Sequence, residues 1–151
     1  MQLKFVNIKE IIMRKNQLRN IYGLDKISKL HHLDLSGNKL ENVDGLGHLE
    51  EVFSLDLSYN QILNVIGLKK LTNINTLDLS CNPQLDDLDG LENVTIANRM
   101  SFYRCFLTNI GGLKNLKAIN ILDLRHNRLT NLDGLNSITT ISTLYLNGNQ
   151  L

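Results

Sequence analysis

Apolar residues recur along this chain in a pattern with a period of 22 residues. One copy of the pattern contains Leu33, Leu35, Leu40 and Leu46, and most equivalent positions in the other copies are also aliphatic. The copies begin near residues 8, 30, 52, 74, 97, 119 and 141, and the copy that begins near 74 gains one residue at Pro83-Gln84. A fixed period of this length predicts a solenoid in which each copy forms one coil.

Each coil combines two shorter periods. Leucine and aspartate alternate in Leu33-Asp34-Leu35, which predicts a short strand with both leucines turned inward. Apolar residues then follow at a spacing of three, at Leu40, Val43, Leu46 and Leu49. This spacing predicts 3₁₀ or short helical turns in the return, which is the segment that leads from one strand back to the start of the next. One coil cannot bury these residues alone, so we expect the coils to stack and share one core. The strands would then line a concave face, with the wider returns on the convex face.

Two further positions, one polar and one small, also recur along the coils. An amide at the bend after the strand can bond the backbone of its own coil and of the neighbouring coil. This predicted asparagine ladder comprises Asn16, Asn38, Asn60, Asn82, Asn127 and Asn149, with Cys105 in the fifth coil. A glycine precedes the leucine of the return in six coils, which predicts either a positive φ or a close backbone approach at that position.

The segments LHHLDLSGNKLENVDGL, LDLSYNQILNVIGLKKL and LDLRHNRLTNLDGL resemble leucine-rich repeats. The 22-residue spacing and the recurring Gly-Leu resemble the class typified by a regulatory subunit of protein phosphatase 1. That class also includes an axonemal dynein light chain and a spliceosomal A-prime protein. Bacterial internalin-type repeats share the same length and are the alternative. The resemblance implies a single α/β solenoid domain over residues 1–151, shaped as a horseshoe or arc, with an incomplete last coil.

The residues on the predicted concave face are the candidates for binding a partner. The column Asp34, Asp56, Asp78 and Asp123 could bind a basic partner, or it could only supply a polar residue between buried leucines. The fifth coil breaks the pattern, which indicates either specificity or the drift of one degenerate repeat. We expect the partner contacts to be Asp34, Asp56, Asp78, Arg99, Ser101, Tyr103, Asp123, Arg125 and Tyr145.

The formal net charge is only +1, but the charges are segregated along the chain. Residues 1–30 carry seven basic and two acidic side chains, residues 31–96 carry three and eleven, and residues 97–151 carry six and two. Such bands can orient a charged partner protein. Basic residues near aromatic ones are confined to Arg99, Phe102, Tyr103 and Arg104, which is too few to predict direct binding of nucleic acid. No apolar run is long enough to predict a membrane span.

The sequence contains no motif for a nucleophile, a phosphate loop or a metal site, so we expect no catalysis, no cofactor and no metal. Cys81 and Cys105 lie on neighbouring coils, where a disulfide is geometrically conceivable, but the ladder position of Cys105 favours free thiols. The N-terminal residues do not have the pattern of a signal peptide. These features favour a cytoplasmic protein, with nuclear or cytoskeletal placement included, over a secreted one.

We therefore expect a non-catalytic scaffold that binds another protein on its concave face. By family analogy, the partner would be a phosphatase catalytic subunit, a cytoskeletal protein or a component of an assembly. Two alternatives stay open: a secreted or surface-exposed internalin-like adhesin or effector module, and a structural spacer within a longer protein. Self-association through the open ends of the solenoid is a further expectation.

Overall fold

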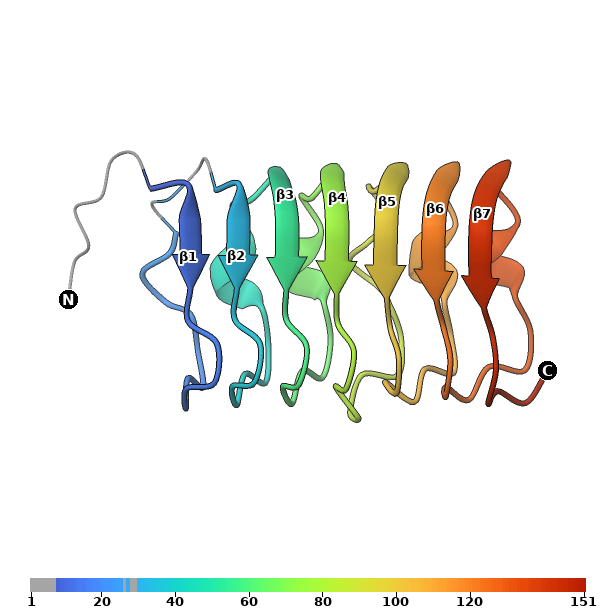
Figure 1. Cartoon of the computed structure of the whole chain (residues 1–151), viewed down its shortest axis with the longest axis horizontal. Coiled ribbons are helices and arrows are strands. Elements are labelled where there is room, and N and C mark those ends of the chain that lie inside the picture. The colour runs from blue at the N-terminus through green and yellow to red at the C-terminus, as the bar shows by residue number, and fades with distance from the viewer. Residues whose placement is uncertain (1–7, 26, 28–29) are drawn as a thin grey trace.

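The structure is a computed structural model that describes residues 8–25, 27 and 30–151. This part of the chain contains one seven-stranded parallel sheet, and its strands lie side by side in chain order (Figure 1). The strands are β1 (Glu10–Ile12), β2 (His32–Asp34), β3 (Glu51–Asp56), β4 (Asn73–Asp78), β5 (Ile96–Ser101), β6 (Ala118–Asp123) and β7 (Thr140–Tyr145). One strand per repeat, each paired in parallel with the next, confirms the predicted solenoid.

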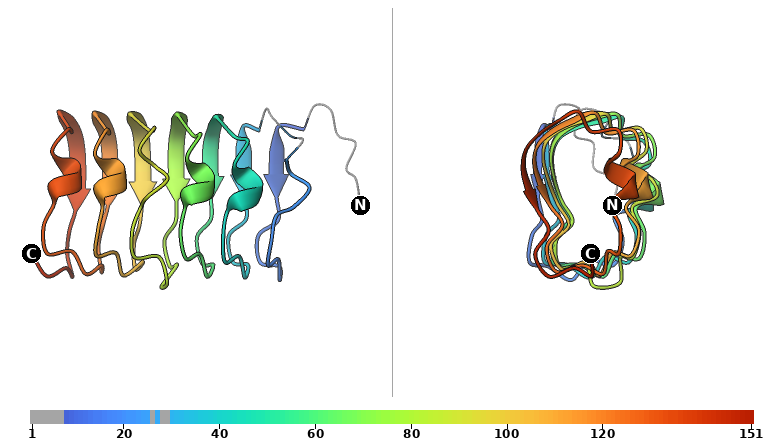
Figure 2. Two further views of the ribbon diagram at one scale, coloured as in Figure 1. Left: turned by 180° about the vertical axis from the view of Figure 1, so that it is seen from behind. Right: turned by 90° about the vertical axis from the view of Figure 1, so that its right-hand side faces the viewer.

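Four returns contain a 3₁₀ helix: η1 (Asp44–Leu46), η2 (Ile66–Leu68), η3 (Gly111–Leu113) and η4 (Asp133–Leu135). Viewed along the solenoid axis, these helices lie on the side opposite the sheet (Figure 2). The described residues contain no α-helix, so the helical part of the fold consists of these single 3₁₀ turns. The return of the fourth coil, which follows the extra residue at Pro83-Gln84, contains turns in place of a 3₁₀ helix.

The inward leucines form one continuous core along the stack. Leu33, Leu55, Leu77 and Leu122 occupy equivalent strand positions and are each no more than 1% exposed. Burial of a leucine contributes roughly 1.5–3 kcal/mol, so this column alone is a major source of stability. Strand β7 pairs with one neighbour only, and the apolar residues of its coil are partly exposed.

The asparagine side chains join each coil to the one before it. The Oδ1 atom of Asn82 accepts the N–H of Ile62 at 3.0 Å, and its Nδ2 atom donates to the carbonyls of Leu57 at 3.1 Å and Leu79 at 2.7 Å. The same three bonds recur at Asn38, Asn60, Asn127 and Asn149. The exception among the asparagines is Asn16, whose amide bonds carbonyls of its own coil.

The cysteine in the ladder is explained by the extra residue in the preceding coil. Elsewhere, a backbone N–H such as that of Ile62 needs an asparagine oxygen from the next coil. In the fourth coil, the N–H of Leu85 instead donates to the Asn82 carbonyl of its own turn at 3.0 Å. The next coil therefore needs no acceptor at this position, and the Cys105 thiol suffices by donating to the Leu79 carbonyl at 3.0 Å.

Both reasons for a recurrent glycine occur in the structure. Gly23 and Gly90 have φ values of +102° and +118°, which residues with a side chain rarely adopt. Gly112 and Gly134 approach the preceding coil closely: an added Cβ would lie 1.9 Å from the Leu88 carbonyl oxygen and 2.0 Å from that of Ile110. The glycines thus let the returns pack directly against one another.

Candidate functional site

The outer surface of the sheet, which is predicted as the concave face, is here called the sheet face. Its acidic column has a local structural role. The Oδ1 atom of Asp56 accepts hydrogen bonds from the N–H of Ser58 at 2.9 Å and from its hydroxyl at 2.7 Å. Asp34 makes the same bonds to Ser36, and Asp78 accepts the N–H of Ser80. These carboxylates therefore stabilise the turn that follows each strand, and Asp34 is buried.

The three carboxylates also lie in register on adjacent strands, since Asp34 pairs with Asp56 and Asp56 with Asp78. Burial raises the pKa of the Asp56 carboxyl, and the neighbouring charges of Asp78 and Asp34 raise it further, although the bonds from Ser58 oppose the shift. A basic group of a partner would relieve this repulsion. This part of the sheet face is therefore suited to a positively charged contact.

The fifth coil places its unusual residues at two different depths. Ser101 is buried, and its hydroxyl bonds that of Ser80 at 2.8 Å. Arg99 is half-buried on β5, where it lies between Thr76 and Ile121 of the adjacent strands. Tyr103 is half-buried just after β5. Of the predicted contacts in this coil, only Arg99 and Tyr103 are accessible.

Tyr103 belongs to a cluster with two other predicted residues. The Arg125 guanidinium carbon lies 5.4 Å from the centre of the Tyr103 ring and 4.8 Å from that of the Tyr145 ring, which are cation–π distances. The Nε atom of Arg125 donates to Oδ1 of Asp123 at 2.9 Å, and Nη2 donates to Oδ2. Residues from three successive coils thus fix one guanidinium between two aromatic rings.

Asp123 is 1% exposed, and its buried carboxylate holds the Arg125 guanidinium in place. Burial alone would raise the pKa of its carboxyl, but the hydrogen bonds and the charge of Arg125 outweigh that effect, and the pKa lies below its ordinary value. The ion pair therefore contributes to stability at neutral pH, and this contribution is lost only as the pH falls through the lowered pKa. Asp123 is consequently a positioning residue for Arg125, and it is too buried to contact a partner.

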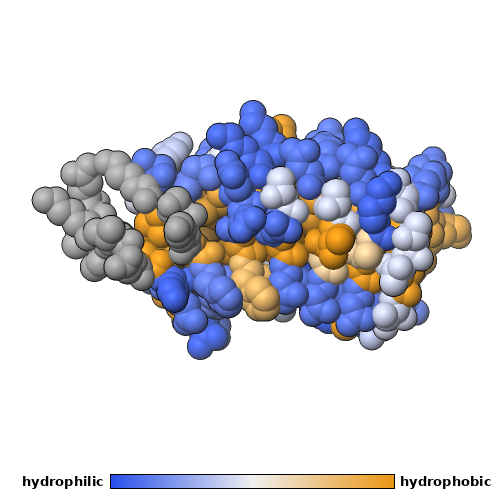
Figure 3. Space-filling model, turned by 90° about the horizontal axis from the view of Figure 1, so that it is seen from above, coloured by the Kyte–Doolittle hydropathy of each residue, from blue (hydrophilic) through white to orange (hydrophobic). Residues whose placement is uncertain are grey.

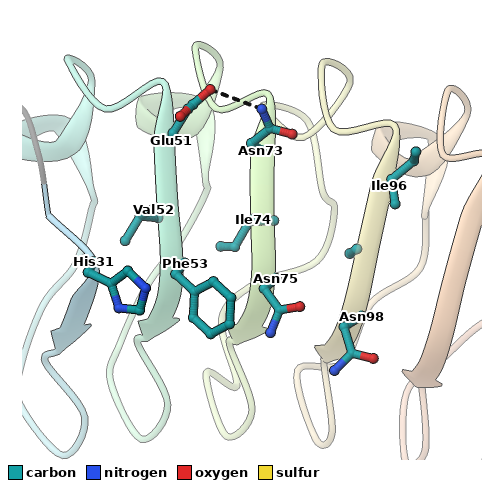
Figure 4. A pocket seen from close by; sticks show the side chains of 10 residues that line it. His31, Glu51, Val52, Phe53, Asn73, Ile74, Asn75, Ile96 and Asn98 are labelled. Carbon is teal, nitrogen blue, oxygen red and sulfur yellow. Dashed lines mark hydrogen bonds between the residues drawn. The ribbon is translucent and has the colours of Figure 1, made fainter.

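A groove of about 470 Å³ lies over the starts of β3, β4 and β5 (Figure 4). His31, Phe53, Asn75 and Asn98 line it in a row, and the rings of His31 and Phe53 stack with their centres 4.6 Å apart. Seen from the side at which the strands begin, apolar side chains run along the solenoid between polar flanks (Figure 3). This groove is open and holds few charged groups, so it suits a contact with an uncharged segment of a protein.

The spacing of the apolar residues in the strands indicates the groove residues, but the assumption that inner and outer residues strictly alternate hides them. Val52 and Leu55 are both buried, so the two residues between them, Phe53 and Ser54, both lie on the outer side. A strand with alternating residues would have only one outer residue there. The irregularity adds an outer row at His31, Phe53, Asn75, Asn98 and Asn120, and none of these residues is among the partner contacts expected from the sequence.

The two cysteines are free thiols in very different surroundings. Cys105 is fully buried, and burial raises the pKa of its thiol to about 12, whereas Cys81 is half-exposed. A maleimide added to the native protein at pH 7 is expected to label Cys81 and leave Cys105 unmodified. Mass spectrometry of tryptic peptides should show one adduct before unfolding in urea and two after it. A native adduct on Cys105, or a Cys81–Cys105 disulfide, would contradict the structure.

Among residues 8–25, 27 and 30–151, no three His, Cys, Asp or Glu side chains come together as metal ligands. The same residues include no helix with the length and apolar character needed to cross a membrane.

The comparisons with known proteins agree with this geometry. Residues 52–93 match a family model described as leucine-rich repeats in two copies, and residues 29–49 match one described as a leucine-rich repeat. The search of curated proteins gives no match.

Two solved structures from Listeria monocytogenes have similar folds. An internalin (inlF) is 22% identical with a TM-score of 0.70, and the alignment covers 95% of this chain and 49% of that one. An internalin C2 (inlC2) is 23% identical with a TM-score of 0.53, and the alignment covers 93% and 71%. The chain therefore spans about half the length of the first of these structures. Residues 29–49 and 52–93 therefore contain leucine-rich repeats, and the described part of the chain has the fold of a leucine-rich repeat solenoid.

Proposed function

We propose that this chain is a non-catalytic scaffold that binds a partner protein on its sheet face, with Tyr103, Arg125 and Tyr145 as the central contacts. The observation that carries the proposal is the stacked cluster, in which Arg125 is held between two rings and by the Asp123 carboxylate. Tyrosine and arginine are the residues most enriched among strong interface contacts. Because these side chains are already ordered, a partner loses less conformational entropy on binding.

The rest of the sheet face supplies contacts of different character. Asp56 and Asp78 on β3 and β4 offer negative charge, and Arg99 on β5 offers positive charge beside the cluster. A partner surface with the complementary order of charges would bind in one orientation only. The scaffold thus acts by presenting a fixed pattern of side chains, without turnover.

The proposal extends to the kind of partner. The 22-residue repeat and its Gly-Leu favour an intracellular role like that of the phosphatase 1 regulatory subunit, with a phosphatase catalytic subunit or a cytoskeletal protein as the first candidates. No family resemblance assigns a residue of this chain to those partners, so the sheet-face cluster is the feature to test.

The test compares proteins captured from a lysate of the source cell by immobilised wild-type chain and by the double variant Tyr103→Ala/Tyr145→Ala. We expect the variant to lose the partner, because both rings that flank Arg125 are removed. With the purified partner, the dissociation constant should rise by at least about tenfold, which corresponds to about 1.4 kcal/mol.

Tyr22→Ala is the matched control, because Tyr22 is a 75% exposed tyrosine in the first coil. It should retain the partner with an unchanged dissociation constant. Circular dichroism should show the same unfolding temperature for all three proteins, since the rings lie on the surface of the sheet. Equal capture by the wild type and the double variant would refute the assignment of the sheet face.

A further inference from the structure

A row of left-handed residues marks the edge of the sheet at which the strands end. In each coil, the residue before the ladder position has a positive φ: Lys15, Gly37, Tyr59, Cys81, Arg104, His126 and Gly148, with values from 55° to 75°. Glycine adopts this conformation freely, whereas another residue is strained by roughly 1 kcal/mol. Five coils nevertheless carry a side chain here, so the turn geometry alone does not explain these residues.

In the fifth and sixth coils, this edge becomes an assembly of arginine and aromatic residues. The Arg104 guanidinium carbon lies 5.2 Å from the centre of the Tyr103 ring, and the His126 ring packs edge-on against that ring at 5.4 Å. The Arg128 guanidinium carbon lies 4.4 Å from the centre of the Phe106 ring, and Phe106 also has a positive φ of 63°. We call Tyr103, Arg104, Phe106, His126 and Arg128 the arginine–aromatic edge.

The charge of this edge is not neutralised within the part of the chain that the structure describes. The ion pair found there joins Arg125 to Asp123, and no carboxylate lies within 4.0 Å of the Arg104 or Arg128 guanidinium. Both arginines are exposed. Between residues 97 and 132, the only acidic side chain is Asp123, which is already committed to Arg125. The arginine–aromatic edge therefore presents two ordered guanidinium groups whose N–H donors face solvent.

We propose that the arginine–aromatic edge binds an acidic segment of a partner protein. Carboxylates of the segment pair with Arg104 and Arg128, because a guanidinium can donate two parallel hydrogen bonds to one carboxylate. Phe106, which is 39% exposed, contacts the apolar part of the same segment. The identification of a protein segment rests on the proposed function, since it assigns the carboxylates to the partner held on the sheet face.

A carboxylate fits this edge better than a nucleic acid does. Single-stranded nucleic acids bind largely by stacking their bases on open aromatic faces. Here Arg104 and Arg125 lie over the Tyr103 ring, and Arg128 lies over the Phe106 ring. The guanidinium groups thus compete for the faces that a base would use, while their own N–H donors stay accessible to oxygen acceptors.

The test uses a fluorescein-labelled peptide of eight glutamates and measures its anisotropy with the full chain at low salt. Arg104→Gln/Arg128→Gln removes both charges with little change in side-chain size, and it should weaken binding by about tenfold or more. Lys114→Gln/Lys117→Gln is the matched control, because it removes two exposed charges from the return of the same region. The control should bind within about twofold of wild type.

Equal weakening by the two double variants would overturn the proposal, since it would mean that net charge alone drives the binding. The proposal also fails if a labelled oligonucleotide of eight thymidines binds more tightly than the peptide and is lost in the Arg104→Gln/Arg128→Gln variant. The sheet face is tested separately with Tyr145→Ala, which removes a residue outside the edge. A Tyr145→Ala variant that loses the natural partner but retains the glutamate peptide supports both assignments. Retention of the natural partner by Arg104→Gln/Arg128→Gln, with loss of the peptide, would overturn the assignment of the acidic segment to that partner and would leave the sheet-face proposal standing.

Discussion

Replacing Asn82 by alanine is expected to lower the free energy of unfolding by about 3–5 kcal/mol. The Asn82 side chain is fully buried and satisfies three backbone groups, the N–H of Ile62 and the carbonyls of Leu57 and Leu79. Alanine would leave the N–H of Ile62 in a dry interior without a partner, which costs about 1–3 kcal/mol. The carbonyls of Leu57 and Leu79 would each lose one hydrogen bond, worth about 1 kcal/mol, and keep the bonds from Asn60 and Cys105. Urea denaturation followed by circular dichroism measures the loss.

Asn120→Ala is the control for this experiment. Asn120 is exposed on β6, and its amide bonds only the side chain of Asn98, at 3.3 Å. Its replacement should change the free energy of unfolding by less than about 0.5 kcal/mol. If Asn82→Ala were as mild as Asn120→Ala, the hydrogen bonds of the ladder would not be what joins the coils.

Replacing Gly112 by alanine is expected to destabilise the protein by more than about 3 kcal/mol. The added Cβ would lie 1.9 Å from the carbonyl oxygen and 2.4 Å from the carbonyl carbon of Leu88. Both atoms belong to the backbone, so no side-chain rotation can relieve the contact, and the fourth and fifth coils must move apart. For a domain of this size, a loss of about 3 kcal/mol lowers the midpoint of thermal unfolding by about 6–12 °C, so a fall of at least about 6 °C is expected.

The neighbouring glycine offers a stringent comparison. Gly111 lies in the same 3₁₀ helix, and its added Cβ would first meet the Asn109 side chain, at 3.1 Å. A side chain can adjust, so Gly111→Ala should cost less than about 1 kcal/mol. Similar losses for the two variants would show that helix propensity, and not the distance between the coils, explains the glycine.

The fold was predictable because its rules repeat. The core leucines, the 22-residue period and the parallel strands all follow from stacking identical coils, and the structure confirms them. The exchange of asparagine for cysteine at position 105 could not be explained from the sequence alone. It depends on the N–H of Leu85, whose partner changes when the preceding coil gains one residue.

The candidate site was less accessible to sequence reasoning, because its geometry depends on departures from the repeat. The alternation of inner and outer strand residues predicts that Asp34, Ser101 and Asp123 are accessible, yet all three are buried. Their side chains are hydrogen-bonded to neighbouring residues, which cover them. The stack of Tyr103, Arg125 and Tyr145 joins residues 42 positions apart, and the left-handed backbone that presents Arg104 has no fixed sequence signature. Whether these side chains bind a partner stays a prediction.

The boundary between β4 and β5 has a mechanical consequence. Pairing there begins only at Thr76 and Arg99, whereas β5 and β6 pair from Ile96 and Ala118 onward, and the fourth coil satisfies the N–H of Leu85 without help from the fifth. In a linear array, each unit is held only by its two neighbours, so tension along the axis is borne in full at every boundary. A boundary held by fewer pairs yields first, so a pull on the two ends of this protein would open this boundary before those on either side of it, which each pair over five residues.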